Sequence, residues 1–297
     1  MKASTSAYIY AGITIALWST VATAFKLALR ELDPLQLVLT AALASTLILL
    51  LVIALQGRLH ELRCLTRQQW LRSAGLGLLN PFAYYVLLFQ AYAVLPAQVA
   101  QSINSTWAIM LALLSVPFLG QKLRPRDCLC MLLGYGGVLI VASGGKLDTL
   151  CSGNLKGMLL AFGSTFFLAS YWIATARASL SPVIALFASF LCSLPWVVGA
   201  TLLFSTWPFS AAFISHHAMA LAAAVHVGLF EMGLGYWMWV TALKLSPSAA
   251  RLSVCAFFVP VLSLFWINLI LHESIAPATF AGLACIISSG ILQSRTG

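Results

Sequence analysis

The sequence predicts an all-α integral membrane protein in which ten transmembrane helices form two inverted five-helix repeats around a central cavity. Three observations predict this fold class: a series of long apolar stretches, an uneven distribution of positive charge, and an internal repeat. The composition agrees, because hydrophobic residues make up 61% of the chain and charged residues only 8%. An ordinary soluble domain carries about 25% charged residues.

Ten apolar stretches follow one another between Tyr8 and Leu292. Each is roughly 20 residues long, which is the length that an α-helix needs to cross a hydrocarbon core about 30 Å thick. The longest connections, residues 56–70 and 205–217, are too short to fold alone, so we expect one membrane domain. The predicted spans are residues 8–29, 35–55, 72–94, 97–119, 128–145, 155–175, 182–204, 218–243, 247–271 and 275–293.

The first span has a second interpretation. Lys2, the apolar stretch and the Ala22-Thr23-Ala24 tripeptide together resemble a cleavable signal peptide. However, the stretch is long enough to span a membrane, contains Trp18 and has a counterpart later in the chain, so we favour a retained helix.

Prolines and glycines mark the other spans. Pro34 opens the second span and Pro182 opens the seventh. A proline inside a helix removes a backbone hydrogen bond, and small residues let helices approach closely. We therefore expect close packing at the glycines of the fifth span, Gly134, Gly136 and Gly137. We expect helix interruptions in the third, fourth, seventh and ninth spans, at Pro81, Pro117, Pro195 and Pro260.

Positive charge gathers at alternate ends of the predicted spans, although the chain as a whole carries a net charge of +9. Cytoplasmic loops of membrane proteins are enriched in Lys and Arg, so this bias predicts that both termini are cytoplasmic. The basic composition then reflects topology, and we expect no nucleic-acid partner. The predicted cytoplasmic residues are Lys2, Arg58, Arg63, Arg67, Arg72, Lys122, Arg124, Arg126, Arg177, Lys244 and Arg295, against Arg30, Lys146 and Lys156 on the other side, with Lys26 just inside a span.

The seven cysteines are scattered, odd in number and mostly at membrane depth. No C-x-x-C pair or Cys/His cluster has the spacing of a zinc site. We predict no disulfide, no metal and no cofactor.

An internal repeat divides the chain into residues 1–150 and 151–297, each with five predicted spans. Because five is odd, the second half must enter the membrane from the opposite side. Inverted repeats of this kind build a site near the membrane midplane and allow alternating access, which points to a transporter. The repeat pairs the segment 12–20 with 157–165, Pro34 with Pro182, Asn80 with Glu231, Tyr85 with Tyr236, and Trp107 with Phe258.

Several short motifs resemble the EamA branch of the drug/metabolite transporter superfamily. They are Leu17-Trp-Ser-Thr20, Gly235-Tyr236 followed by Trp239, and Phe258-Val-Pro-Val-Leu-Ser263 followed by Glu273. Asn104-Ser-Thr-Trp107 and Gly120-Gln-Lys122 are similar to the bacterial aromatic amino acid exporters of this branch. EamA halves usually carry Glu where Lys122 stands, and the aromatic amino acid exporters share this departure.

The resemblance implies an exporter of amino acids and related metabolites in the bacterial inner membrane. It also implies a cavity lined by the first, third and fourth helices of each half. Trp18 and Trp107 are the residues that the family pattern carries over most directly. The other aromatic residues that it places on these helices are Tyr84, Tyr171, Tyr236 and Phe257.

The depth of the aromatic residues supports two of these positions independently. Trp18 and Trp107 lie about ten residues inside their spans, where an indole N–H needs a protein partner. Tyr84, Tyr171 and Tyr236 fit either the cavity or the lipid face. Aromatic residues near span ends are usually interfacial anchors, and we assign Tyr8, Tyr10, Trp70, Trp196 and Trp207 to that group.

Charged and amide side chains inside spans are the remaining candidates. Glu231 is an ionisable group at membrane depth, which is a functional hypothesis by default. It would bind a substrate ammonium or carry protons, or it is a protonated acid bonded to its neighbours with help from His226. Lys26 would attract a carboxylate, extend outward, or pair with Glu31 or Asp33. Asn80 and Asn104 are expected as polar substrate contacts or as interhelical hydrogen-bonding groups.

Other functions fit less well. A nucleotide-sugar or lipophilic-cation transporter of the same superfamily is the first alternative. An intramembrane enzyme is disfavoured because the chain has no G-x-S-x-G, H-E-x-x-H or loop-facing carboxylate cluster. It has no P-loop either, so we expect no ATPase subunit. The predicted working unit is a monomer in a lipid bilayer with a small-molecule substrate, either proton-coupled or facilitative.

Overall fold

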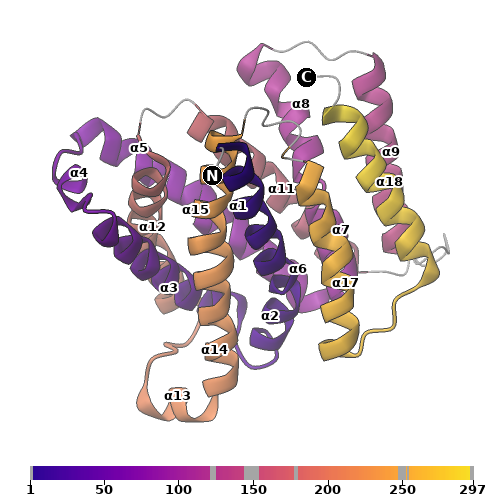
Figure 1. The fold of residues 1–297 in the computed structure, drawn as a ribbon. Coiled ribbons are helices and arrows are strands. Elements are labelled where there is room, and N and C mark those ends of the chain that lie inside the picture. The colour runs from indigo at the N-terminus through magenta and orange to yellow at the C-terminus, as the bar shows by residue number, and fades with distance from the viewer. Residues whose placement is uncertain are drawn as a thin grey trace.

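The structure is a computed structural model that describes residues 3–120, 125–143, 154–176, 180–246, 252 and 254–294. The described chain is helical throughout, without strands (Figure 1). Seven helices are long and apolar enough to cross a membrane: Thr5–Ala28, Pro34–Leu55, Arg67–Val94, Ala97–Phe118, Leu155–Thr175, Pro182–Phe204 and Ala218–Leu245. The apolar helices at the other three predicted spans are shorter: Cys128–Val141, Phe258–Leu271 and Pro277–Leu292.

Most of the long spans are divided into shorter helical elements. In the first half, defined here as residues 3–143, these are α1 (Ala3–Ser19), α2 (Val21–Ala28), α3 (Pro34–Leu55), α4 (Leu59–Arg63), α5 (Arg67–Gly77), η1 (Leu78–Ala83), α6 (Tyr84–Val94), α7 (Ala97–Asn104), α8 (Trp107–Leu119) and α9 (Pro125–Ser143). In the second half, residues 154–294, they are α11 (Leu155–Ala176), α12 (Pro182–Phe204), α13 (Ala211–His216), α14 (Ala218–His226), η2 (Val227–Gly233), α15 (Leu234–Leu245), η3 (Val254–Phe257), α17 (Phe258–Leu271) and α18 (Pro277–Ser294).

Local sequence explains several helix boundaries. Asp33 begins α3 by accepting hydrogen bonds from the N–H groups of Leu35 and Gln36, and the Gln36 side chain accepts one from the Asp33 N–H. This reciprocal cap satisfies N–H groups that have no partner within the helix. Pro34 and Pro182 occupy the first positions of α3 and α12, as predicted.

The prolines inside the spans differ in their effects. Pro81 lies in η1, a π-helical segment in which Asn80 departs from helical geometry, as expected for an interruption. By contrast, α8 and α12 continue past Pro117 and Pro195, so the predicted interruptions there do not end the helices. Pro260 lies in the first turn of α17, where the missing N–H costs little.

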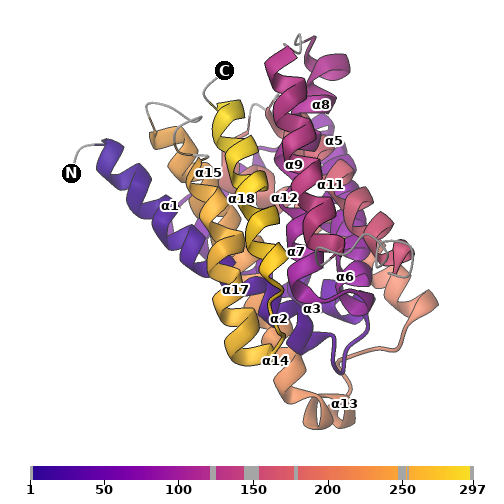
Figure 2. The same ribbon diagram turned by 90° about the vertical axis from the view of Figure 1, so that its right-hand side faces the viewer.

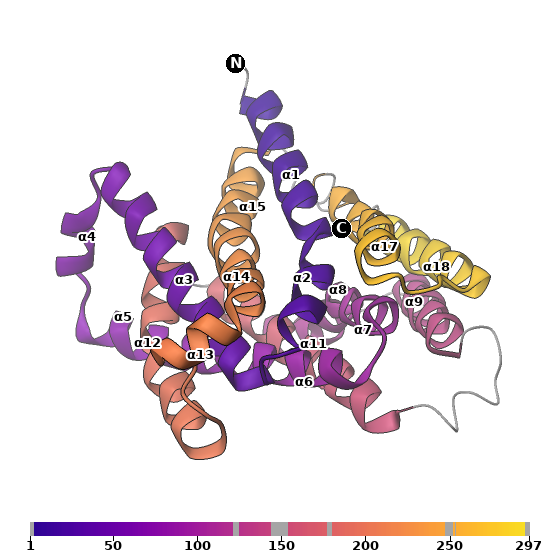
Figure 3. The ribbon, with the colours of Figure 1, turned by 90° about the horizontal axis from the view of Figure 1, so that it is seen from below.

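The two halves pack against each other through exchanged contacts. α1 lies against α15 and α17, whereas α11 lies against the equivalent helices of the first half, α6 and α8. Likewise, η2 packs on α3 and η1 packs on α12. Figures 2 and 3 show α9 beside α18. This reciprocity is what a two-fold relation between the halves produces.

Glycines allow the closest helix crossings, at paired positions. A Cβ atom on Gly77 would collide with the backbone carbonyl of Ser189 in α12, and one on Gly228 would collide with the carbonyl of Ala41 in α3. Gly137 of α9 and Gly282 of α18 lie against each other, because a Cβ atom on either would collide with the backbone carbonyl of the other. Gly134 is also tightly packed, whereas Gly136 has open space, so the predicted close packing of the fifth span involves two of its three glycines.

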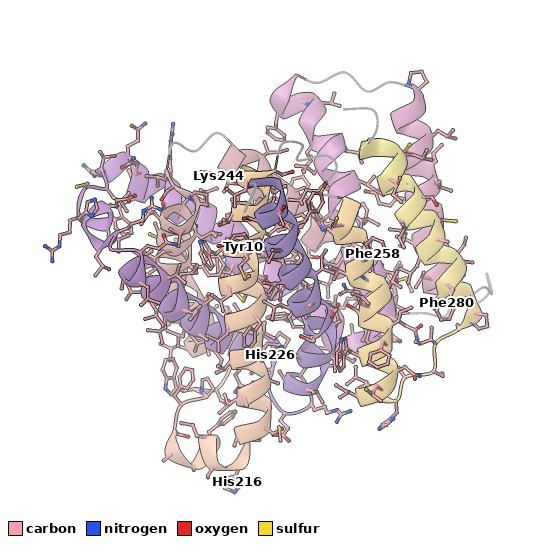
Figure 4. The ribbon with its side chains drawn as sticks, in the orientation of Figure 1. Tyr10, His216, His226, Lys244, Phe258 and Phe280 are labelled. Carbon is pink, nitrogen blue, oxygen red and sulfur yellow. The ribbon has the colours of Figure 1, made fainter. Side chains whose placement is uncertain are left out.

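The start of α1 and the end of α18 lie toward one end of the molecule, called here the terminal end, and α13 lies at the other, called the α13 end (Figure 1). Figure 4 places Lys244 toward the terminal end and His216 at the α13 end. α4 and the start of α5, with Arg58, Arg63 and Arg67, also lie toward the terminal end. The α4–α5 segment and Lys244 therefore lie toward the same end of the described fold.

Candidate functional site

A cavity of about 140 Å³ lies between the two halves. The elements that line it are α1, α2, α6, α7, α8, α11, η2, α15, η3 and α17, which belong to the first, third and fourth predicted spans of each half. The walls are mainly apolar, as in most small-molecule sites. The aromatic lining residues are Trp18, Phe25, Tyr84, Trp107, Trp172, Tyr236 and Trp239, and the polar ones are Gln101, Asn104, Ser105 and Glu231.

The structure brings six of the eight predicted site residues together in this cavity: Trp18, Tyr84, Trp107, Tyr236, Glu231 and Asn104. Asn80 and Tyr171 do not line it. Asn80 is fully buried in η1, and neither its amide oxygen nor its amide nitrogen has a hydrogen-bond partner among the described residues. Tyr171 is buried and packs its ring against Trp172 at a centroid distance of 5.5 Å.

Sequence reasoning did not select Trp172, Trp239, Gln101 or Ser105 as site residues. Trp239 follows Tyr236 by three residues, so its place on the same helix face could have been found from the helical period. The same period relates Gln101 to Asn104. No such signal separates Trp172 from its neighbour Tyr171 in a span that is apolar all round.

The aromatic side chains form a continuous row along the cavity. Consecutive ring centroids lie 5.5 Å apart from Trp239 to Trp18, 6.0 Å from Trp18 to Tyr236, 5.8 Å from Tyr236 to Trp172 and 6.4 Å from Trp172 to Trp107. These spacings match those of attractive aromatic pairs. The row crosses from one half to the other, so its geometry depends on how the halves are placed. Phe258, the repeat counterpart of Trp107, is 60% exposed instead (Figure 4).

Glu231 is the one carboxylic acid side chain among the described lining residues. It lies in the π-helical segment η2 and is only 9% exposed, and its Oε2 atom has no partner in the described chain. Tyr84 and Tyr236 line the same cavity, and the Tyr236 hydroxyl accepts a hydrogen bond from the Tyr85 hydroxyl. Its backbone carbonyl accepts a long hydrogen bond of 3.5 Å from Trp18 Nε1. Short π-helical segments occur frequently at functional sites.

Two predicted side-chain partners differ from those observed. His226 was expected beside the Glu231 carboxyl, but the hydrogen bond that the structure gives it is to Thr20 Oγ1, at 3.0 Å. Lys26 does not pair with Glu31 or Asp33. Its Nζ donates to the carbonyls of Tyr92 and Leu95, both at 2.9 Å. The C-terminus of α6 has free carbonyls and partial negative charge, which is why it attracts an ammonium group.

Two tyrosines meet where the halves join. The Tyr85 hydroxyl donates to the Tyr236 hydroxyl at 3.2 Å, and these residues are counterparts in the repeat. Residues that touch their own counterpart lie on the axis that relates two copies. This pair indicates where a two-fold axis between the halves would pass.

Polar contacts between the halves gather at the α13 end. The Gln36 amide donates to Thr206 Oγ1 at 2.8 Å, His217 lies 3.1 Å from Glu31, and the Ser205 hydroxyl donates to Asp33. Both carboxylate oxygens of Glu273 accept the Ala97 N–H at 3.1 Å, so Glu273 caps α7. Thr279 donates to the Gln98 side chain at 2.9 Å. The described structure is thus tied together at this end.

Arg251 and Lys122 lie outside the described residues, as does the side chain of Phe257. The cavity position that the resemblance implies for Phe257 remains a prediction for this reason.

A bundle of long apolar helices with an aromatic cavity between two reciprocally packed halves defines a membrane protein of the transporter class. Residues 5–143 and 155–295 each match the EamA-like transporter family, and the chain belongs to this family. Members of the family are transporters rather than enzymes.

Three relatives agree with this assignment. The chain is 24% identical to the uncharacterized transporter YvbV of Bacillus subtilis, over 81% of this chain and 76% of that protein. It is 25% identical to an uncharacterized transporter of Archaeoglobus fulgidus, over 94% of this chain and 95% of that protein. It is 25% identical to the aromatic amino acid exporter YddG of Ancylobacter novellus, over 70% of each chain. A crystal structure with 20% identity has the same fold, with a TM-score of 0.68 over 99% of this chain and 98% of the other.

Proposed function

We propose that this protein is a secondary transporter that exports amino acids, including aromatic ones, across the bacterial inner membrane by alternating access. The observation that carries the proposal is the aromatic cavity at the junction of two halves with exchanged contacts. The similarity to a named aromatic amino acid exporter supports the substrate class. The alternative is a transporter of another small metabolite or of a drug-like cation.

The proposal includes ten spans, five in each half, with the second half inverted. Seven long helices and three shorter apolar helices coincide with the ten predicted stretches, which supports this number. The exchanged packing of α1 and α11 and the contact between the counterparts Tyr85 and Tyr236 support a two-fold relation. With the positive-inside rule, the terminal end faces the cytoplasm and the α13 end faces outward.

The contacts at the α13 end support a state in which the outer side is closed. Substrate would then enter the cavity from the cytoplasm, and opening outward would require these contacts to break. A two-fold relation suggests that the halves exchange conformations during the cycle. In the other state η1 would take the place of η2, and the unpartnered amide of Asn80 would then face the substrate.

The capping of α7 by Glu273 gives a prediction about this equilibrium. Glu273→Ala removes the acceptor of the Ala97 N–H. Because loss of a helix cap costs about 1 kcal/mol, the outward-open population is expected to rise roughly fivefold. Replacing the seven native cysteines and introducing Ser105→Cys in the cavity would provide a reporter. Its reaction rate with an impermeant thiol reagent added from outside should rise by that factor. Glu61→Ala, on α4 at the terminal end, serves as the control, and equal rates in both variants would contradict this role for Glu273.

Uptake into proteoliposomes tests the proposed function directly. Purified protein would be assayed with a panel of radiolabelled amino acids, with and without an imposed pH gradient. We expect saturable uptake that Trp107→Ala reduces strongly, because Trp107 closes one end of the aromatic row. If a pH gradient drives uptake and Glu231→Gln abolishes that response, the transport is proton-coupled. If uptake does not respond to the pH gradient and Glu231→Gln leaves it unchanged, the protein is a facilitator. Absence of flux for every amino acid would overturn the proposal in favour of other metabolites or cations.

A further inference from the structure

The cavity has two chemically different polar regions. One is the free carboxylate oxygen of Glu231 in η2. The other consists of Gln101 and Asn104, which are three residues apart on α7 and therefore lie on one helix face. The Tyr84 phenol lines the cavity with both regions and donates to Asn104 Oδ1 at 3.3 Å.

The hydrogen bonds of the two amides determine what they can offer a ligand. The Tyr92 hydroxyl donates to Gln101 Oε1 at 2.6 Å, and the Tyr84 hydroxyl donates to Asn104 Oδ1. Both amide oxygens are therefore occupied. The side-chain nitrogens have no hydrogen bond in the described structure, so each amide presents N–H donors. Neutral N–H donors suit an anionic acceptor such as a carboxylate.

A break in the fourth predicted span adds to this region. α7 ends at Asn104 and α8 begins at Trp107, which also lines the cavity. The N-terminus of a helix carries partial positive charge and unpaired N–H groups, both of which favour an anion. Discontinuous helices in transporters commonly direct such a terminus at a substrate carboxylate. The side chains and the backbone at this break thus favour the same kind of ligand.

The region around Glu231 favours a cation. Glu231 carries the carboxylate, and the rings of Trp18 and Tyr236 lie beside it in the aromatic row. Aromatic faces within about 6 Å attract an ammonium group. A cavity of about 140 Å³ is similar in size to apolar cavities that hold one benzene ring. The cavity therefore has room for one aromatic side chain.

We infer that the cavity is a zwitterion site in which Glu231 binds the α-ammonium group of the substrate, while Gln101 and Asn104 bind its α-carboxylate through their side-chain N–H groups. This inference rests on the proposed function and specifies its substrate as a free α-amino acid with both charged groups exposed. Gln101 is the specificity-determining residue for the carboxylate. The aromatic row accommodates the side chain without selecting it strictly.

Three compounds that share a phenylethyl skeleton test the two regions separately. Phenylalanine has both charged groups, phenethylamine lacks the carboxylate, and 3-phenylpropanoate lacks the ammonium group. Binding would be measured calorimetrically on the purified full-length protein. Phenylalanine is expected to bind at least tenfold more tightly than either of the others, since hydrogen bonds to charged groups are the stronger ones. If phenethylamine bound as tightly as phenylalanine or more tightly, the assignment of a carboxylate-binding region would be wrong.

Matched variants locate the two groups. Gln101→Glu and Asn104→Asp keep an acceptor for the tyrosine hydroxyls but replace the N–H donors by negative charge. Each is expected to weaken phenylalanine binding at least tenfold while leaving phenethylamine binding unchanged or stronger. Gln98→Glu, on the same helix but toward Thr279, should keep the wild-type preference. Glu231→Gln should reduce the preference for phenylalanine over 3-phenylpropanoate, and Glu231→Asp should retain it.

Parallel uptake of phenylalanine separates this inference from the proposed function. Saturable phenylalanine transport without a preference over phenethylamine would refute the zwitterion site and leave amino acid transport standing. Binding and transport of phenethylamine alone would refute both and support a cation transporter. If none of the three compounds binds or is transported, both proposals fail.

Discussion

Trp18→Ala is expected to reduce the transport efficiency, kcat/KM, by about 100-fold. Trp18 lies within the aromatic row, with Trp239 at 5.5 Å on one side and Tyr236 at 6.0 Å on the other. Its indole N–H also points at the carbonyl of Glu231. Losing about 100 Å² of apolar contact with the substrate costs roughly 2.5 kcal/mol, and the lost alignment of Glu231 adds to this. Every 1.4 kcal/mol corresponds to a factor of ten.

The measurement is initial uptake of the best substrate into proteoliposomes, normalised to the amount of folded protein. Trp196→Ala is the matched control, because Trp196 lies on α12 outside the cavity lining and is 53% exposed. Its kcat/KM should stay within about twofold of the wild type, as for most surface changes. Trp18→Phe retains a ring and should fall between the two. Equal losses for Trp18→Ala and Trp196→Ala would show that the aromatic row does not contact substrate.

Gly77→Ala is expected to destabilise the folded protein, although alanine is the better helix former. The added Cβ would collide with the backbone carbonyl of Ser189, which cannot move without shifting α12. Overpacking of this kind costs about 1–3 kcal/mol. Gly228→Ala is expected to have a similar effect, because Gly228 contacts the carbonyl of Ala41 in the equivalent crossing.

Thermal unfolding of the detergent-solubilised protein checks this prediction. A loss of 1–3 kcal/mol should lower Tm by several degrees. Gly75→Ala and Gly199→Ala are the matched controls, since a Cβ at either position meets nothing within 4 Å. Both should leave Tm unchanged or raise it slightly. If Gly77→Ala were as stable as Gly75→Ala, the helix crossing described at Ser189 would be wrong.

The repeat in the sequence identified equivalent polar positions, but it did not predict which of them faces the cavity. Asn80 and Glu231 were paired by the repeat, and both lie in π-helical segments of equivalent helices. However, only Glu231 lines the cavity, because the two halves adopt different positions relative to it. A repeat in sequence cannot indicate which half is closed in a given state.

The same limit applies to Tyr171 and Trp172. They are neighbours on α11, about 100° apart around the helix, and both could have faced the cavity. The structure turns Trp172 inward, between Trp107 and Tyr236, and buries Tyr171 against the packed helices. The helical period by itself gives no preference here, since both faces of the helix are apolar.

The sequence by itself determined that this chain crosses a membrane, where the helices opened by Pro34 and Pro182 begin, and that Glu231 lies at membrane depth. These features follow from local chemistry: uninterrupted apolar length, helix-opening prolines and an ionisable residue within an apolar stretch. Only the tertiary structure decided which faces enclose the cavity and which amide atoms are free. In a bilayer, lipid-facing and core-facing surfaces are equally apolar, so hydrophobic pattern does not distinguish them. The contacts of α1 with α15, and of Tyr92 with Gln101, make that distinction.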